Sequence, residues 1–314
     1  MKKFFALLLA TLMVVALAAC SGYDAAAPAV CAALEASGWT PGRGAVVLVK
    51  PNLLRSVPLA CTHPRVVAAV CSWLLDQGAR VRVADSPGFG TAVGVARAVG
   101  LTEALRPLGL NVSPLDRPVP ISLGRGGRWG VSRLALESDA LLSVPKVKVH
   151  AMMRLSLSLK NLFGCVCGLR KAWAHTRQGG RSDDFVSGLL DLYAALPPVT
   201  ALADGVEAMH VTGPSDGQPF PLGLVGASTV AAALDAVLSA LLGARPVDVP
   251  LWAEAIRRGL PGTDPAVLRY PLERPENFAV GGFELPATLD DISFRPHRLA
   301  LSLSRRVIRA WRGA

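Results

Sequence analysis

The chain has 314 residues, of which 51% are hydrophobic and 18% charged, and its formal net charge is +10. This composition excludes a disordered chain and supplies enough apolar surface for the core of an α/β protein. Nucleic-acid binding would fit the net charge, but the arginines are scattered and no basic run is interleaved with aromatic residues, so no nucleic-acid partner is expected.

The first 20 residues allow two interpretations. Lys2 and Lys3 precede an apolar run that ends in Leu17-Ala18-Ala19-Cys20. This run is shorter than the roughly 20 residues of a membrane span and resembles the signal peptide of a bacterial lipoprotein, in which Cys20 would be lipidated. The sequence favours this interpretation, and with it a membrane-anchored protein of the cell envelope. In the alternative, residues 13–20 form a buried first strand and the protein is cytoplasmic.

Strand and helix patterns alternate after this segment. A helix is expected near residues 25–37, a strand at 45–50, a helix at 63–78 and a strand at 79–85. The last three form a β-α-β unit, which predicts an α/β fold with a mostly parallel, doubly wound sheet and flanking helices. Lys50 and Asp85 then stand at the carboxyl ends of two parallel strands, where open α/β sheets bind their ligands.

The rest of the chain continues this pattern after a less regular middle segment. Residues 108–143 predict short strands with a turn at 124–127. The segments that follow are expected to be a helix at 185–196, a strand at 199–205, a strand at 222–228 and a helix at 229–243. No linker divides the chain, so a single α/β domain is predicted over 21–296. Residues 297–314 predict a basic amphipathic helix, which either packs on the core or lies on an anionic membrane.

Lysine is rare in this chain and is concentrated in one stretch. Residues 144–164 contain Lys146, Lys148 and Lys160, three of the seven lysines, whereas arginine supplies most of the positive charge. In a strand, Lys146, Lys148 and His150 point to the same face. Two ammonium groups that start roughly 7 Å apart repel by on the order of 2.4 kcal/mol at an effective dielectric of about 20. A lowered lysine pKa or a bound anion would relieve this repulsion.

Other polar residues are expected near these lysines. Asn161 follows Lys160 directly and carries an amide that both donates and accepts hydrogen bonds. Lys171 and His175 are four residues apart and share one face if their segment is helical. Solvated surface lysines are the alternative, but this chain uses arginine for surface charge, and lysine is the cation whose pKa shifts readily. We therefore favour a functional role for the cluster.

Taken in order, these motifs resemble the domain-of-unknown-function 362 family. The resemblance extends from about Tyr23 to Pro296 and is carried by Lys50-Pro51-Asn52, Thr62-His63-Pro64, Asp85-Ser86-Pro87-Gly88, Pro145-Lys146-x-Lys148-x-His150, Lys160-Asn161-Leu162-Phe163-Gly164, Lys171 with His175, Asp204-Gly205 and Gly213-Pro214-x-x-Gly217. It implies a site at these residues and leaves the reaction open. Members of the family also tend to begin with a strand before a Tyr-Asp pair such as Tyr23-Asp24, which favours the strand interpretation of residues 13–20.

The six cysteines do not indicate a cofactor. They show none of the spacings of a disulfide framework or a metal site. Some relatives in the family carry ferredoxin-like cysteine runs for iron–sulfur clusters, and this chain has no such run. No iron–sulfur cofactor is therefore expected, and the sequence indicates no other cofactor.

We predict a site lined by lysine and histidine that binds a small anionic molecule, a carboxylate or a phosphate. In the first hypothesis the protein is an enzyme, with Lys148 as a base or Schiff-base nucleophile and His150 or His175 moving a proton with Asp85 or Asp204 as partner. The residues expected to bind the ligand are Lys50, Asn52, His63, Ser86, Lys146, Lys160, Asn161, Lys171 and Asp204.

Two other hypotheses remain open at this stage. The protein could be a non-catalytic envelope lipoprotein that captures an anionic ligand or a metal-bound species. His63, His150, His175 and Asp85 could instead hold a metal, but they lack a zinc-like spacing, and no metal ligand is predicted. Contact with a membrane would come from a lipidated Cys20 or from the basic C-terminal helix.

Overall fold

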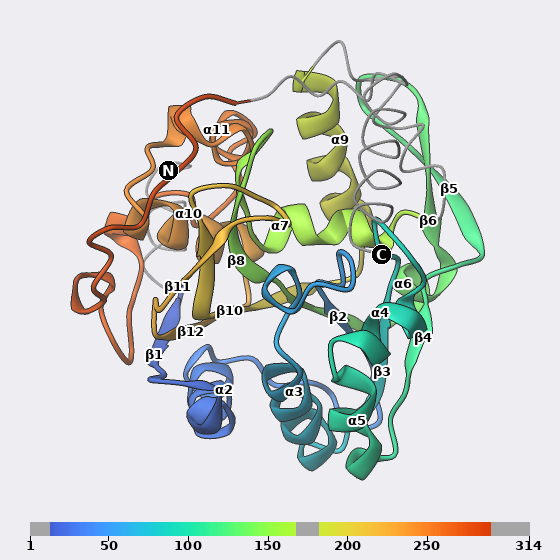
Figure 1. Ribbon diagram of the computed structural model, residues 1–314. Helices are drawn as coiled ribbons and strands as arrows, with labels where there is room; N and C mark the ends of the chain where they lie inside the picture. The colour runs from blue at the N-terminus through green and yellow to red at the C-terminus, as the bar shows by residue number, and fades with distance from the viewer. Residues whose placement is uncertain (1–12, 168–181, 290–314) are drawn as a thin grey trace, which may run out of the picture.

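A ten-stranded mixed sheet runs through the molecule in the computed structural model, which describes residues 13–167 and 182–289 (Figure 1). Five neighbouring strands of this sheet are parallel. In spatial order they are β10 (Val199–His210), β7 (Ala140–Val144), β2 (Val46–Pro51), β3 (Arg80–Asp85) and β4 (Val112–Pro114). The predicted α/β fold with a mostly parallel sheet is confirmed.

The sheet becomes antiparallel beyond β10. Strand β12 (Leu224–Ser228) runs antiparallel to β10, and β1 (Ala16–Ala19) runs antiparallel to β12. The sequence predicted the strand at 222–228 but not its direction, because a short buried apolar run looks the same in either direction. Strand β11 (Gln218–Phe220) also pairs antiparallel with β10.

The lysine-rich segment forms its own strand beside β10. Strand β8 (Lys146–His150) follows β7 after Pro145, and it runs parallel to β10 with Lys146 opposite Asp204. Strand β9 (Arg154–Ser156) returns antiparallel along β8. The long β10 therefore supports both β7 and β8, and it brings its own aspartate beside the first lysine of β8.

Helices cover both faces of the sheet (Figure 1). One face carries α2 (Ala26–Ala36), α3 (Pro64–Asp76), α4 (Ala92–Ala98) and α5 (Leu101–Leu105). The other carries α7 (Ser158–Asn161), α9 (Ser182–Ala195), α10 (Ala231–Leu241) and α11 (Pro250–Arg257). A hydrophobic core lies on each face of the sheet, and alternate residues of β2 point into the two cores. Val47 and Val49 pack with the first group of helices, and Leu48 packs with the second.

The middle segment is less regular, as its sequence predicts. Strands β5 (Pro118–Ser122) and β6 (Arg128–Ser132) form a separate antiparallel hairpin, whose turn includes the predicted glycines at 124–127. The short helix α6 (Arg133–Glu137) then leads back to β7.

The N-terminal residues that the structure describes include a buried strand, as in the second interpretation of this segment. Val15, Ala16 and Leu17 are fully buried, and the backbone N–H of Cys20 donates to Gly223 O at 2.7 Å. Processing before Cys20 would therefore remove β1 from the sheet. Within residues 13–167 and 182–289, no helix is long and apolar enough to cross a membrane. The C-terminal helix predicted at 297–314, like Lys171 and His175, lies outside the described residues.

Candidate functional site

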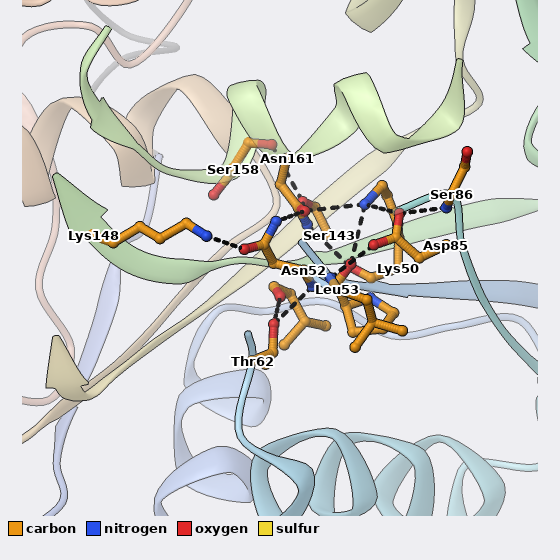
Figure 2. Close-up of polar contacts among 12 residues, drawn as sticks. Lys50, Asn52, Leu53, Thr62, Asp85, Ser86, Ser143, Lys148, Ser158 and Asn161 are labelled. Atoms are coloured by element: carbon orange, nitrogen blue, oxygen red, sulfur yellow. Dashed lines mark hydrogen bonds and ion pairs between the residues drawn. The ribbon is translucent and has the colours of Figure 1, made fainter. Parts of the chain in front are cut away.

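A buried ion pair joins the carboxyl ends of β2 and β3 (Figure 2). Nζ of Lys50 lies 2.8 Å from Oδ1 of Asp85, and both side chains are almost fully buried. The carboxylate of Asp85 also accepts the backbone N–H groups of Leu53 and Ser86, each at 2.8 Å. The predicted meeting of Lys50 and Asp85 at this edge of the sheet is thus present, and the lysine's charge is neutralised by the chain's own carboxylate.

Gly164 packs directly against this ion pair. It belongs to the 3-10 helix η4 (Leu162–Cys165), and a Cβ built on it would lie 2.3 Å from both Nζ of Lys50 and Oδ1 of Asp85. No side chain fits in that space. The last residue of the Lys-Asn-Leu-Phe-Gly motif must therefore be glycine for the backbone of η4 to approach the pair.

Two asparagine amides connect Lys50 to Lys148. Nδ2 of Asn161 donates to Lys50 O and to Ser143 Oγ, both at 3.1 Å, so Oδ1 of Asn161 faces Nζ of Lys50 at 3.0 Å and Nδ2 of Asn52 at 3.3 Å. This network assigns the amide orientations. Oδ1 of Asn52 in turn accepts a hydrogen bond from Nζ of Lys148 at 2.6 Å (Figure 2). A continuous polar chain therefore runs from Asp85 to Lys148.

Asp235 on α10 holds the helix that carries Asn161. Its carboxylate accepts the backbone N–H groups of Ser158 at 2.8 Å and Leu159 at 2.9 Å, at the start of α7. Burial raises the pKa of Asp235 to about 7, against the lowering effect of these hydrogen bonds. Because α7 has only a single turn, this buried acceptor fixes where the helix starts and hence where Asn161 reaches the polar chain.

Lys148 forms no ion pair with a carboxylate of the described residues. Its side chain is 1% exposed, and Nζ donates to Asn52 Oδ1 and to Ala60 O, both at 2.6 Å. In the described part of the chain, no carboxylate oxygen lies within 4.0 Å of this nitrogen. Burial lowers the pKa of Lys148 to about 7; the charges of Cys61 and Asp85 oppose this shift, and the charges of Lys160 and Lys146 add to it. The lowering comes mainly from burial, and the repulsion from Lys146 along this strand is a smaller cause.

Lys146 has its own buried carboxylate. Nζ of Lys146 lies 3.2 Å from Oδ2 of Asp204, and it also donates to the hydroxyl of Tyr23. That hydroxyl donates to Oδ1 of Asp204 at 3.2 Å, and the backbone N–H of His63 donates to Oδ2 at 2.8 Å. Burial and the charge of Asp204 raise the pKa of Tyr23 above its usual range, so the phenol stays neutral.

His63 stacks on Tyr23 at the edge of this second cluster. The two ring centroids are 3.5 Å apart and the planes differ by 9°. Nδ1 of His63 accepts the backbone N–H of Arg65 at 3.2 Å and so caps α3, which places the proton of the neutral imidazole on Nε2. Burial lowers the pKa of His63, Asp204 opposes this shift and Lys146 adds to it. The predicted residues Lys146, Asp204 and His63 thus lie together.

Tyr23 is a member of the site that the sequence prediction did not include. It comes 40 residues before His63 in the chain. Its only sequence signal is its place in the Tyr-Asp pair of the family motif. The stacking with His63 depends on how the 3-10 helix η1 (Tyr23–Ala25) packs near α3, which no local pattern encodes.

Three other predicted residues lie in different surroundings. His150 is buried at the end of β8, where Nδ1 accepts the backbone N–H of Met152 at 3.1 Å. Nζ of Lys160 lies 5.0 Å from the ring centre of Phe163 and 5.5 Å from that of Phe185, a cation–π arrangement. Ser86 contributes its backbone N–H to Asp85.

The metal hypothesis gains no support from the described residues. In residues 13–167 and 182–289, no three histidine, cysteine, aspartate or glutamate side chains are grouped so that they could hold a metal ion. His63 and Asp85 belong to two different polar clusters, each centred on its own lysine.

These features define an α/β protein with a buried, lysine-centred polar site at the carboxyl edge of its sheet. The profile of the family described as Domain of unknown function (DUF362) matches residues 47–240. Thylakoid-associated protein sll1697 of Synechocystis sp. is 36% identical over 261 residues, which cover 79% of this chain and 78% of the relative. The chain therefore belongs to the DUF362 family.

Two solved structures share part of the fold. The lactate racemase apoprotein from Thermoanaerobacterium thermosaccharolyticum superposes with a TM-score of 0.47 and 15% identity, over 70% of this chain and 55% of that chain. A structural-genomics protein from Thermotoga maritima superposes with a TM-score of 0.41 and 13% identity, over 65% of this chain and 54% of that chain. The chain thus spans little more than half the length of each.

Proposed function

We propose that this protein is an enzyme that acts on a small anionic substrate, a carboxylate or a phosphate, and that Lys148 supplies a neutral amine at the reacting centre. The observation that carries this proposal is the contrast among three buried lysines. Lys50 and Lys146 each have a carboxylate partner, whereas the acceptors of Lys148 among the described residues are two neutral oxygens. An unpaired buried ammonium is costly, so the amine loses its proton instead. A neutral amine with a pKa near 7 is a general base at physiological pH.

The charge balance of the site explains why the substrate would be anionic. Lys50 with Asp85 and Lys146 with Asp204 form two neutral pairs. The proton on Lys148 is therefore a charge that no carboxylate of the described residues pairs with. An anion bound beside Lys148 would stabilise the protonated amine, so substrate binding and proton uptake by Lys148 would reinforce each other. In this proposal, Lys50 and Asp85 position the asparagine amides and do not contact the substrate.

Proton abstraction can be tested without knowing the natural substrate. The full chain is incubated in D₂O with a panel of small carboxylates, and loss of the ¹H signal next to the carboxylate is followed by NMR. We expect exchange with the wild type and none with Lys148→Met. Arg82→Met is the control, because it also replaces a basic side chain by methionine, and Arg82 is exposed on β3. Exchange by Lys148→Met at the wild-type rate would refute the base role. Saturable binding by the wild type without any exchange would instead support a non-catalytic binding protein.

We also propose that the protein associates with a membrane. The support is the relative of 36% identity, which is named as thylakoid-associated. The contact would come from the basic segment 295–314 or from a lipidated Cys20, and these routes can be separated. Vesicle co-sedimentation of the full chain, but not of a chain that ends at Pro296, would indicate the basic segment. Mass spectrometry of the protein from its native host would detect a lipidated Cys20, whereas an intact Met1 would exclude it.

A further inference from the structure

Both hydrogen-bond acceptors of Lys148 belong to one loop. Asn52 and Ala60 both lie in the connection between β2 and α3, and Nζ of Lys148 donates to each at 2.6 Å. Among the described residues, every hydrogen bond of residues 55–59 is made within residues 55–61. The bond from Lys148 to Ala60 O is therefore the polar contact that ties this part of the loop to β8.

We propose that Lys148 reacts as a nucleophile and forms a Schiff base with a small carbonyl compound that also carries a carboxylate, a 2-oxo acid being the simplest case. This inference rests on the proposed function, and it names the substrate class for the same site.

The ion-pair partners of the three buried lysines indicate which of them can act as the nucleophile. A buried amine attacks a carbonyl carbon only when its nitrogen lone pair is free, and a carboxylate partner would keep the nitrogen protonated. Lys50 and Lys146 have such partners at 2.8 Å and 3.2 Å, and Lys148 has none among the described residues. At neutral pH an ordinary lysine is neutral in on the order of one molecule in 10³, whereas an amine with a pKa of about 7 is half neutral.

The required charge on the substrate follows from the electrostatics of the site. Protonation of a Schiff base would place a positive charge where no carboxylate of the described chain forms an ion pair with Lys148. A carboxylate next to the substrate's carbonyl group would supply that missing counter-ion. A neutral ketone or aldehyde would leave the positive charge buried and unpaired, which is unfavourable.

The covalent step balances without another reagent. The lone pair on Nζ of Lys148 attacks the carbonyl carbon, so a C–N bond forms and the carbon–oxygen double bond becomes a single bond. The carbinolamine then breaks its C–O bond, and the oxygen leaves as water with the two protons that the amine carried. The product is the imine, which keeps a single N–H when it is protonated. The hydrogen bonds from Nζ to Asn52 Oδ1 and to Ala60 O therefore cannot both persist in the adduct.

Reductive trapping tests this inference. The full chain is incubated at pH 7 with pyruvate and cyanoborohydride, and the reduced adduct is located by peptide mass spectrometry. Methyl pyruvate is the matched probe, because it presents the same carbonyl group without the charge. We expect the adduct on Lys148 to exceed that on every other lysine by about tenfold or more. We also expect pyruvate to label Lys148 faster than methyl pyruvate does, although the ester is the stronger electrophile.

Two further measurements separate the possible failures. NMR of lysine-labelled protein gives the pKa of Lys148, and Lys148→Arg keeps the charge but cannot form a Schiff base. A pKa near 7 without an adduct on Lys148 would overturn the Schiff base and leave the base role standing. A pKa above 10 would overturn both proposals. Equal labelling by methyl pyruvate would overturn the requirement for an anionic substrate, and labelling of Lys148→Arg at the wild-type level would place the adduct on another residue.

Discussion

Replacing Gly164 by alanine probes the packing of the site most directly. The added Cβ would lie 2.3 Å from Nζ of Lys50 and from Oδ1 of Asp85, whereas ordinary contacts begin at 3.4 Å. Either η4 or the ion pair must therefore move. Overpacking of a core costs about 1–3 kcal/mol, and complete loss of one partner of a buried ion pair costs about 3–5 kcal/mol. We expect Gly164→Ala to lower the free energy of unfolding by about 3 kcal/mol.

Urea denaturation followed by tryptophan fluorescence measures this difference. Gly281→Ala is the matched control, because no atom lies within 4 Å of the Cβ that it would add. The control should stay within about 0.5 kcal/mol of the wild type. If Gly164→Ala were as stable as Gly281→Ala, the close approach of η4 to the Lys50–Asp85 pair would be refuted.

Three further predictions concern the ion pairs, the pH dependence and the first strand. Asp204→Asn leaves Lys146 buried without its carboxylate, so urea denaturation should show a loss of about 3 kcal/mol, and a loss below 1 kcal/mol would contradict the buried pair. The pKa of Lys148 is about 7 when folded against 10.5 as its ordinary value, so between these pH values the unfolded chain binds more protons at this group and the contribution of Lys148 to stability should rise with pH. This rise should be missing in Lys148→Met, and an identical pH profile for the variant would argue against the shift. A chain that begins at Cys20 loses the buried Val15 and Leu17, each worth about 1.5–3 kcal/mol, and should melt well below a chain that begins at Met13; equal melting temperatures would show that β1 is dispensable.

The central fold was predictable because its local patterns are strong. The apolar run of β2, the proline-started helix α3 and the glycine that follows it each have a physical cause in a few neighbouring residues. The direction of β12 was not predictable, because it depends on pairing with β10 and not on local composition. The choice between a signal peptide and β1 was equally hidden, since an apolar segment ending in small residues suits both.

The sequence indicated several residues that lie close together in the site, but it did not indicate which of them form ion pairs. Strand ends and shared strand faces placed Lys50, Asp85, Lys146 and Lys148 near one another. Which lysine would have a carboxylate partner depends on long-range packing. Lys146 and Asp204 are 58 residues apart in the sequence. Ser158 at the start of α7 and Asp235, which accepts its backbone N–H, are 77 residues apart. Gly164 illustrates the same limit, because the resemblance identified the motif while only the packing explains its last residue.

The proposed function depends on a neutral amine at Lys148 at physiological pH. The most direct measurement is an NMR titration of the full chain labelled with ¹³C and ¹⁵N in lysine, with the Lys148 signal assigned by its absence from Lys148→Met. We expect an inflection near pH 7 for this signal. An inflection above pH 10, as for an ordinary lysine, would contradict it.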